Sequence, residues 1–234
     1  MKSELDLMGE ESRLSAEFAK FRSKKEVTCG EIRERILDGR LAPGQKITID
    51  AISAELGVSH IPIREAFTQL SAEGLVFYRS YSGVSVSPLN RAVALEVLLL
   101  IELFESAFAQ RKDGEQIAVR LAPLLDRLAE PELPADRFQL VRDEFSCVLC
   151  DPDGGMEFSL SRLLHTRVVE HWRRVEALAG LCLSAARRAL LVDEHFKFVD
   201  AMRAGNARES LDLRLAEIHR RREDIDAAMP APRG

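Results

Sequence analysis

The feature that most constrains the fold lies between residues 50 and 87, where two short amphipathic helices meet at a glycine. Apolar residues at helical spacing predict a helix over 50–56, and Gly57 then ends it, because glycine readily takes the left-handed conformation that follows many helices. A second helix is expected over 59–72, with Ser59 as its N-cap. Two helices joined by so tight a turn predict a helix-turn-helix.

The segments around this pair of helices complete the pattern. A helix is expected over 27–37, followed by an extended step at 47–49. After the second helix, residues 75–79 and 84–87 are predicted to be short strands around a turn at 81–83. A helix-turn-helix that is followed by a small hairpin is a winged helix-turn-helix.

The chain beyond Pro88 lacks strand signals and carries helical apolar stripes throughout. We expect an antiparallel all-α bundle of six helices there, which makes the whole protein mainly α. The predicted helices cover residues 90–110, 113–129, 135–149, 156–178, 181–204 and 206–227. The chain is thus predicted to consist of an N-terminal extension, a winged helix-turn-helix domain, a helical domain and a disordered tail, at residues 1–23, 24–88, 89–228 and 229–234.

Charge and hydropathy limit the class of protein. The formal net charge is −5, but residues 24–88 carry eight basic and eight acidic side chains, so the acidity lies mainly in the helical part. Such a balance argues against coating nucleic acid over the whole surface and permits one local binding face. The most apolar run, 92–109, contains three glutamates, and no secretory signal opens the chain. We therefore expect a cytoplasmic protein that has no membrane partner.

The second helix of the pair has the features of a DNA recognition helix. Ser59, His60 and Arg64 are expected on its outward face, opposite the apolar stripe. Arg64 can form a bidentate pair with guanine or contact a phosphate, and the free N–H groups at a helix start suit a phosphate. Gly83 in the hairpin would allow close approach to the DNA backbone or minor groove.

Several stretches of this region closely resemble the GntR family of regulators: 32–44, 56–59, 62–66 and 70–76. The resemblance implies a homodimer that binds a pseudo-palindromic site in double-stranded DNA. Position 60 is usually arginine in similar proteins and is His60 here, which predicts a different affinity or site preference. We expect DNA contacts from Asp50, Ser59, His60, Ile61, Pro62, Arg64, Ser82 and Gly83.

The helical remainder resembles the effector domain of the FadR-type branch, known as FCD, in its six-helix, VanR-like version. This resemblance implies a repressor whose DNA affinity is controlled by a small-molecule effector such as a carboxylic acid. Many FCD domains also hold a divalent metal ion, and here Arg142 and Ser146 replace two of the four expected ligands. His195 matches a third ligand, and Glu217 stands at the fourth position, with His219 two residues later.

We therefore expect no metal cofactor of the family type. If a metal is bound, its ligands would be His195, Glu217 and His219, and a shifted alternative would combine Asp143 and Cys147 with the two histidines. Leu98 also stands where similar proteins often have an arginine that binds an effector carboxylate. The hypothesis is a metal-free effector site whose candidate residues are Leu98, Arg142, Ser146, His195 and Glu217.

Less specific interpretations stay open for the same residues. Arg142 can instead pair with a neighbouring acid at the surface, leaving a vestigial pocket, and His195 can be a hydrogen-bonded core residue. Cys147 and Cys150 have CxxC spacing, which gives a redox-responsive regulator as an alternative, although packed thiols are the simpler interpretation. An enzyme is not expected, because no phosphate loop, GxSxG or HExxH motif occurs.

Overall fold

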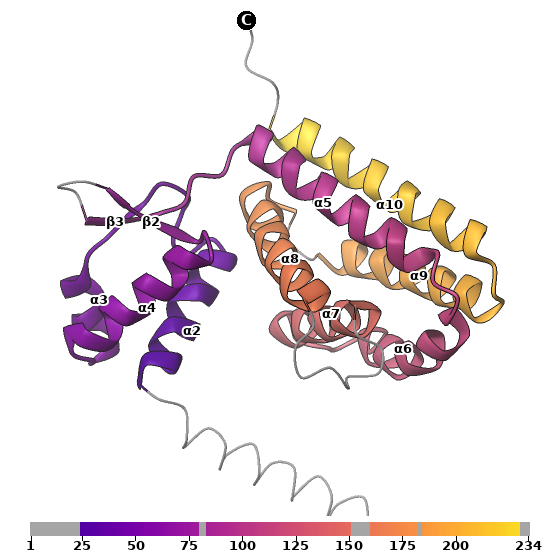
Figure 1. Cartoon of the computed structure of the whole chain (residues 1–234), viewed down its shortest axis with the longest axis horizontal. Coiled ribbons are helices and arrows are strands. Elements are labelled where there is room, and N and C mark those ends of the chain that lie inside the picture. The colour runs from indigo at the N-terminus through magenta and orange to yellow at the C-terminus, as the bar shows by residue number, and fades with distance from the viewer. Residues whose placement is uncertain (1–23, 80–82, 151–159, 182–183, 230–234) are drawn as a thin grey trace, which may run out of the picture. The chain divides into compact units, whose positions relative to one another are not determined.

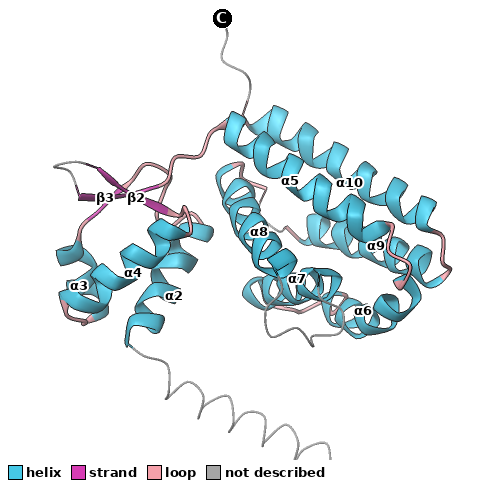
Figure 2. Cartoon of the chain, viewed as in Figure 1, coloured by secondary structure: helices cyan, strands magenta, loops and turns pink. Residues whose placement is uncertain are grey.

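In a computed structural model, the chain forms two compact units that divide between Pro88 and Leu89 (Figure 1). The structure describes residues 24–79, 83–150, 160–181 and 184–229. The described residues are mainly helical and include one small antiparallel sheet, as predicted (Figure 2). None of the described helices combines the length and the apolar character needed to cross a bilayer.

The described residues of the first unit form three helices and a three-stranded sheet in the strand order β1-β3-β2. Its elements are α2 (Lys24–Leu37), β1 (Lys46–Ile47), α3 (Ile49–Leu56), α4 (His60–Ala72), β2 (Val76–Arg79) and β3 (Gly83–Val86). The expected order of helices and hairpin is therefore present; β2 begins one residue later than predicted and ends where predicted, and β3 lies one residue earlier than predicted.

Local signals set the ends of the two central helices. The Thr48 hydroxyl accepts a hydrogen bond of 3.2 Å from the Ala51 N–H and caps α3. Gly57 ends α3 with φ of 64°, a conformation that side chains with a Cβ rarely adopt. Ser59 is the N-cap of α4, as predicted, although its side chain makes no capping hydrogen bond.

Strand β1 is the part of the sheet that the sequence indicated least clearly. Only an extended step was expected there, but Ile47 pairs with Val84 and Lys46 pairs with Ser85. β3 thus lies between β1 and β2 and has a partner on both edges. The core of the unit lies between this sheet and the helices, and its largest fully buried side chain is Phe67.

In the part of the second unit that the structure describes, six helices form a bundle, as predicted. The helices are α5 (Arg91–Ala109), α6 (Gly114–Leu128), α7 (Ala135–Cys150), α8 (Leu160–Leu178), α9 (Ala185–Arg203) and α10 (Ala207–Ala228). α5 packs against α10 and α8, whereas α6 packs against α9 and α7. The predicted start of one helix at Leu181 is wrong, because Ser184 caps α9 through the Arg187 N–H.

Candidate DNA-binding surface and interior polar cluster

The start of α4 presents a row of exposed residues. Ser59, His60, Ile61 and Arg64 are all exposed, and 70% of the Ile61 surface is accessible. Pro62 is buried, so its side chain packs inside the unit, and its expected contact with DNA stays a prediction. Ile61, by contrast, lies on the exposed side of the helix.

A polar contact joins the starts of the two central helices. Asp50 lies in the first turn of α3, and its Oδ1 is 3.3 Å from Nε2 of His60. Both side chains are exposed, at 89% for Asp50 and 52% for His60. The turn between the helices therefore places an acidic residue beside the predicted DNA-reading residues.

The hairpin contributes an exposed glycine at its described end. Gly83 begins β3 with φ of 86°, so a larger residue would be strained at this point. Lys46 from β1 lies beside it, with Cε 4.0 Å from the position that a Cβ on Gly83 would take. The predicted contact Ser82 lies outside the described residues. Sequence reasoning missed Lys46, because its position depends on the pairing of β1 with β3.

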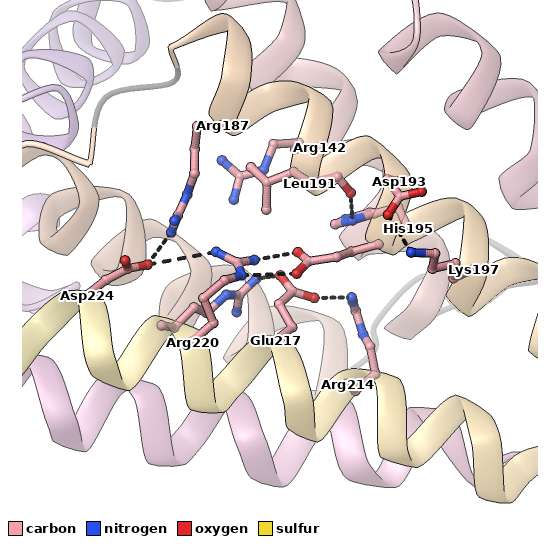
Figure 3. A network of polar contacts seen from close by, with 12 residues as sticks. Arg142, Arg187, Leu191, Asp193, His195, Lys197, Arg214, Glu217, Arg220 and Asp224 are labelled. Carbon is pink, nitrogen blue, oxygen red and sulfur yellow. Dashed lines mark hydrogen bonds and ion pairs between the residues drawn. The ribbon is translucent and has the colours of Figure 1, made fainter.

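The interior of the second unit contains a cluster of charged residues that joins α10 to α5. Glu217 is only 1% exposed and accepts hydrogen bonds from Arg214 at 2.6 Å (Figure 3) and from Arg221 at 2.5 Å. The Glu105 carboxylate lies 3.5 Å from Arg214 and 3.6 Å from Arg221. Burial would raise the pKa of Glu217, but attraction to Arg221 and Arg214 lowers it overall.

His195 lies close to this cluster on α9 and is buried. Its Nδ1 is 2.7 Å from the carbonyl oxygen of Leu191, and its ring centroid is 4.7 Å from that of Phe145. A carbonyl can only accept, so Nδ1 carries the proton and Nε2 keeps its lone pair. Burial lowers the pKa of His195 to about 3, and the ring is therefore neutral near pH 7.

The predicted effector residues on α5 and α7 have other environments. Arg142 is buried and forms a two-pronged ion pair with Glu176 of α8, at 3.2 and 3.3 Å. Leu98 is buried in an apolar cluster that includes Trp172. Ser146 is half-buried on α7.

Comparison with known proteins identifies the first unit. Residues 24–86 match the family described as bacterial regulatory proteins of the gntR family. Over these residues the chain is similar to regulatory proteins of the GntR type. The residues that the sequence singled out at the start of α4 lie within this match.

Individual relatives support this assignment. An uncharacterized HTH-type transcriptional regulator of Mycobacterium tuberculosis is 33% identical over 73 residues, which is 31% of this chain and less than a third, 30%, of the relative. The gluconate operon transcriptional repressor of Bacillus licheniformis is 22% identical over 85% of this chain and 82% of its own length. A putative GntR transcriptional regulator from Rhodococcus has the same fold, with a TM-score of 0.71 and 22% identity over 88% of this chain and 99% of its own.

In the second unit, the structure does not bring together the residues of either alternative metal site. His195 is buried whereas His219 is exposed, and Glu217 is held between two arginines. Asp143, from the shifted site, accepts a hydrogen bond from Gln139 at 2.9 Å. Across the described ranges, no three His, Cys, Asp or Glu side chains are placed to share a metal ion.

The interpretation of Arg142 as a surface residue paired with a neighbouring acid is wrong, whereas its effector role stays a prediction. Arg142 is buried, and its guanidinium pairs with Glu176 inside the bundle. Sequence reasoning missed Glu176, Glu105, Arg214 and Arg221. The sequence carried a signal for Glu105, Arg214 and Arg221, because these charged residues stand at positions of the apolar stripes of α5 and α10.

The two α7 cysteines differ in exposure. Cys147 is half-buried and Cys150 is buried, near the end of the helix. Their neighbour Glu144 is exposed, and Asp143 contacts Gln139 and Arg173. Packed thiols and a redox-responsive pair both remain predictions.

Proposed function

We propose that this chain is a transcriptional regulator of the GntR type that binds operator DNA through the start of α4. The observation that carries the proposal is the exposure of Ser59 and Arg64 at that helix start, within the matched domain. The N-terminal N–H groups of α4 lack a bond from the Ser59 side chain and suit a phosphate oxygen. Arg64 then contacts guanine through two donors or holds a phosphate.

The regulator acts as a homodimer on a pseudo-palindromic operator in the cytoplasm. In dimeric helix-turn-helix proteins the two half-sites are about 34–36 Å apart, one turn of DNA. Support for self-association comes from α5, where Leu99 and Leu103 are exposed one helical turn apart, and from α8, where Leu160 and Leu164 share this arrangement. Exposed apolar patches of this kind commonly mark protein interfaces.

We further propose that the protein is a repressor whose helical unit is an FCD-type, VanR-like effector domain. The Bacillus licheniformis relative is named a repressor, and the six-helix bundle supports the domain type. The effector is a small metabolite, such as a carboxylic acid, that binds without a metal ion. Since Glu176 already pairs with Arg142, and Glu105 and Glu217 pair with Arg214 and Arg221, an acid must displace one of these carboxylates to reach any of these three guanidinium groups.

Arg64→Ala tests the DNA-binding proposal. A bound sequence is first selected from a randomised duplex library with the unaltered protein, and affinities are then measured by fluorescence anisotropy. Loss of the Arg64 contacts should weaken binding about 10- to 100-fold, since one bidentate base contact contributes about 1–3 kcal/mol. Arg40→Ala is the matched control, because Arg40 is exposed after α2 and pairs with Asp38. Equal affinities for Arg64→Ala and the unaltered protein would refute the proposed surface.

A further inference from the structure

An apolar side chain lies at the start of the exposed face of α4. Ile61 is 70% exposed, and no other large apolar side chain in the described ranges is as accessible. It lies one helical turn before Arg64 and Glu65, which are also exposed, so the three residues share one face of the helix. The opposite face packs into the core of the first unit through Ile63, Ala66, Phe67 and Leu70. The exposed face therefore begins with a branched apolar group.

The position of Ile61 matters more than its exposure, since single apolar side chains are common on protein surfaces. The first turn of a recognition helix is the part that reaches the base edges in the major groove. Ile61 is β-branched, and a helix restricts its χ1 angle largely to one rotamer, so the side chain needs little further ordering on binding. The neighbouring Pro62 is buried, so this turn is packed against the unit. The turn thus holds an apolar group in a nearly fixed direction.

We propose that Ile61 is a specificity-determining residue that recognises the 5-methyl group of a thymine. This inference rests on the proposed function, in which the start of α4 contacts operator DNA. Among the four bases, thymine alone presents a methyl group in the major groove. An isoleucine side chain has no hydrogen-bond donor or acceptor, so contact with that methyl group is the interaction by which it distinguishes a base. Arg64, one turn later, contacts a guanine or a phosphate independently.

Replacement of thymine by deoxyuridine tests this contact, because it removes the methyl group and leaves every hydrogen-bonding group of the base in place. The bound sequence is first selected from a randomised duplex library with the unaltered full chain. Each thymine of one half-site is then replaced in turn, and affinities are measured by fluorescence anisotropy. At one thymine the replacement should weaken binding about three- to fivefold, the factor expected for one methyl-sized apolar group. At the other thymines the change should stay below about twofold.

Variants of Ile61 assign the effect to this side chain. Ile61→Ala should bind the thymine and deoxyuridine duplexes with affinities that differ by less than about 1.5-fold, since it lacks the carbons that contact the methyl group. Ile61→Val keeps the branched Cβ and should retain a preference of about twofold or more. Val27→Ala is the matched control, because Val27 is 55% exposed on α2, and it should keep the full preference of the unaltered protein.

The outcomes separate this inference from DNA binding itself. Urea unfolding of each variant checks that these surface changes leave the fold intact. If Ile61→Ala keeps the thymine preference of the unaltered protein, or if no thymine of the selected half-site depends on its methyl group, this inference is overturned and DNA binding stands. If no duplex is enriched by the unaltered protein, the proposed function fails and this inference fails with it.

Discussion

Acidification from pH 7 to pH 5 should destabilise the helical unit through two buried histidines. Burial lowers the pKa of His165 to about 4 and that of His195 to about 3, with smaller repulsion from nearby arginines. Both histidines bind a proton below about pH 6.5 when the chain is unfolded but stay neutral in the fold. The unfolded state therefore binds more protons, and the free energy of unfolding falls as the pH falls.

The size of this effect follows from the same values. Each histidine lowers the free energy of unfolding by about 1.4 kcal/mol per pH unit between 6.5 and its folded pKa. Over the interval from pH 7 to pH 5 the two histidines together should lower it by about 4 kcal/mol, out of a typical 5–15 kcal/mol. Burial raises the pKa of Glu105, despite attraction to Arg214 and Arg221, and this opposes part of the loss.

Urea unfolding at pH 7, 6 and 5 measures this dependence. The chain has a single tryptophan, Trp172, which is buried in α8 and therefore reports on the helical unit by fluorescence. His165→Phe is the matched variant, because His165 packs edge-on against Phe104 and Phe108 at 5.3 and 5.4 Å. Its stability should fall by about 2 kcal/mol less over the same interval. Glu105 contributes equally to the pH dependence of both proteins. Identical pH dependence of the unaltered protein and His165→Phe would therefore refute the conclusion that folded His165 carries no added proton.

Two further changes test the interior cluster and the helix caps. Glu217→Gln should lower the free energy of unfolding by about 3–5 kcal/mol in the same fluorescence experiment, because Arg214 and Arg221 lose their closest buried partner; a loss below about 1 kcal/mol would contradict this account. Thr48→Ala should cost the first unit about 1 kcal/mol, whereas Ser59→Ala should cost clearly less, since only Thr48 makes a capping bond. Circular dichroism during urea unfolding compares the two, and equal losses would count against the cap assignment.

The fold was largely predictable because its signals are local. Gly57, the cap Ser59 and the helical apolar stripes depend only on neighbouring residues, and they gave the order of elements. Strand β1 was only partly predictable, because the two residues Lys46 and Ile47 become a strand through pairing with β3, almost 40 residues away. A two-residue segment carries no alternation of its own that could indicate that partner.

The site residues were predictable where their environment depends on local helical spacing and not where it depends on how helices pack. The outward face of Arg64 follows from helical spacing, and the structure agrees on its exposure. The state of Arg142 does not follow, because its partner Glu176 lies 34 residues away on another helix. Long-range ion pairs depend on how helices pack, and a single sequence does not fix that packing.

The junction between the two units has a mechanical consequence. The Ser87 N–H donates to the Leu75 carbonyl in the first unit, while Leu89 is already buried in the core of the second. Pro88, whose ring fixes its own φ, is the only residue between these two anchors. The backbone between the two cores is thus anchored on both sides of a single proline, so the sequence leaves no separate linker segment between them.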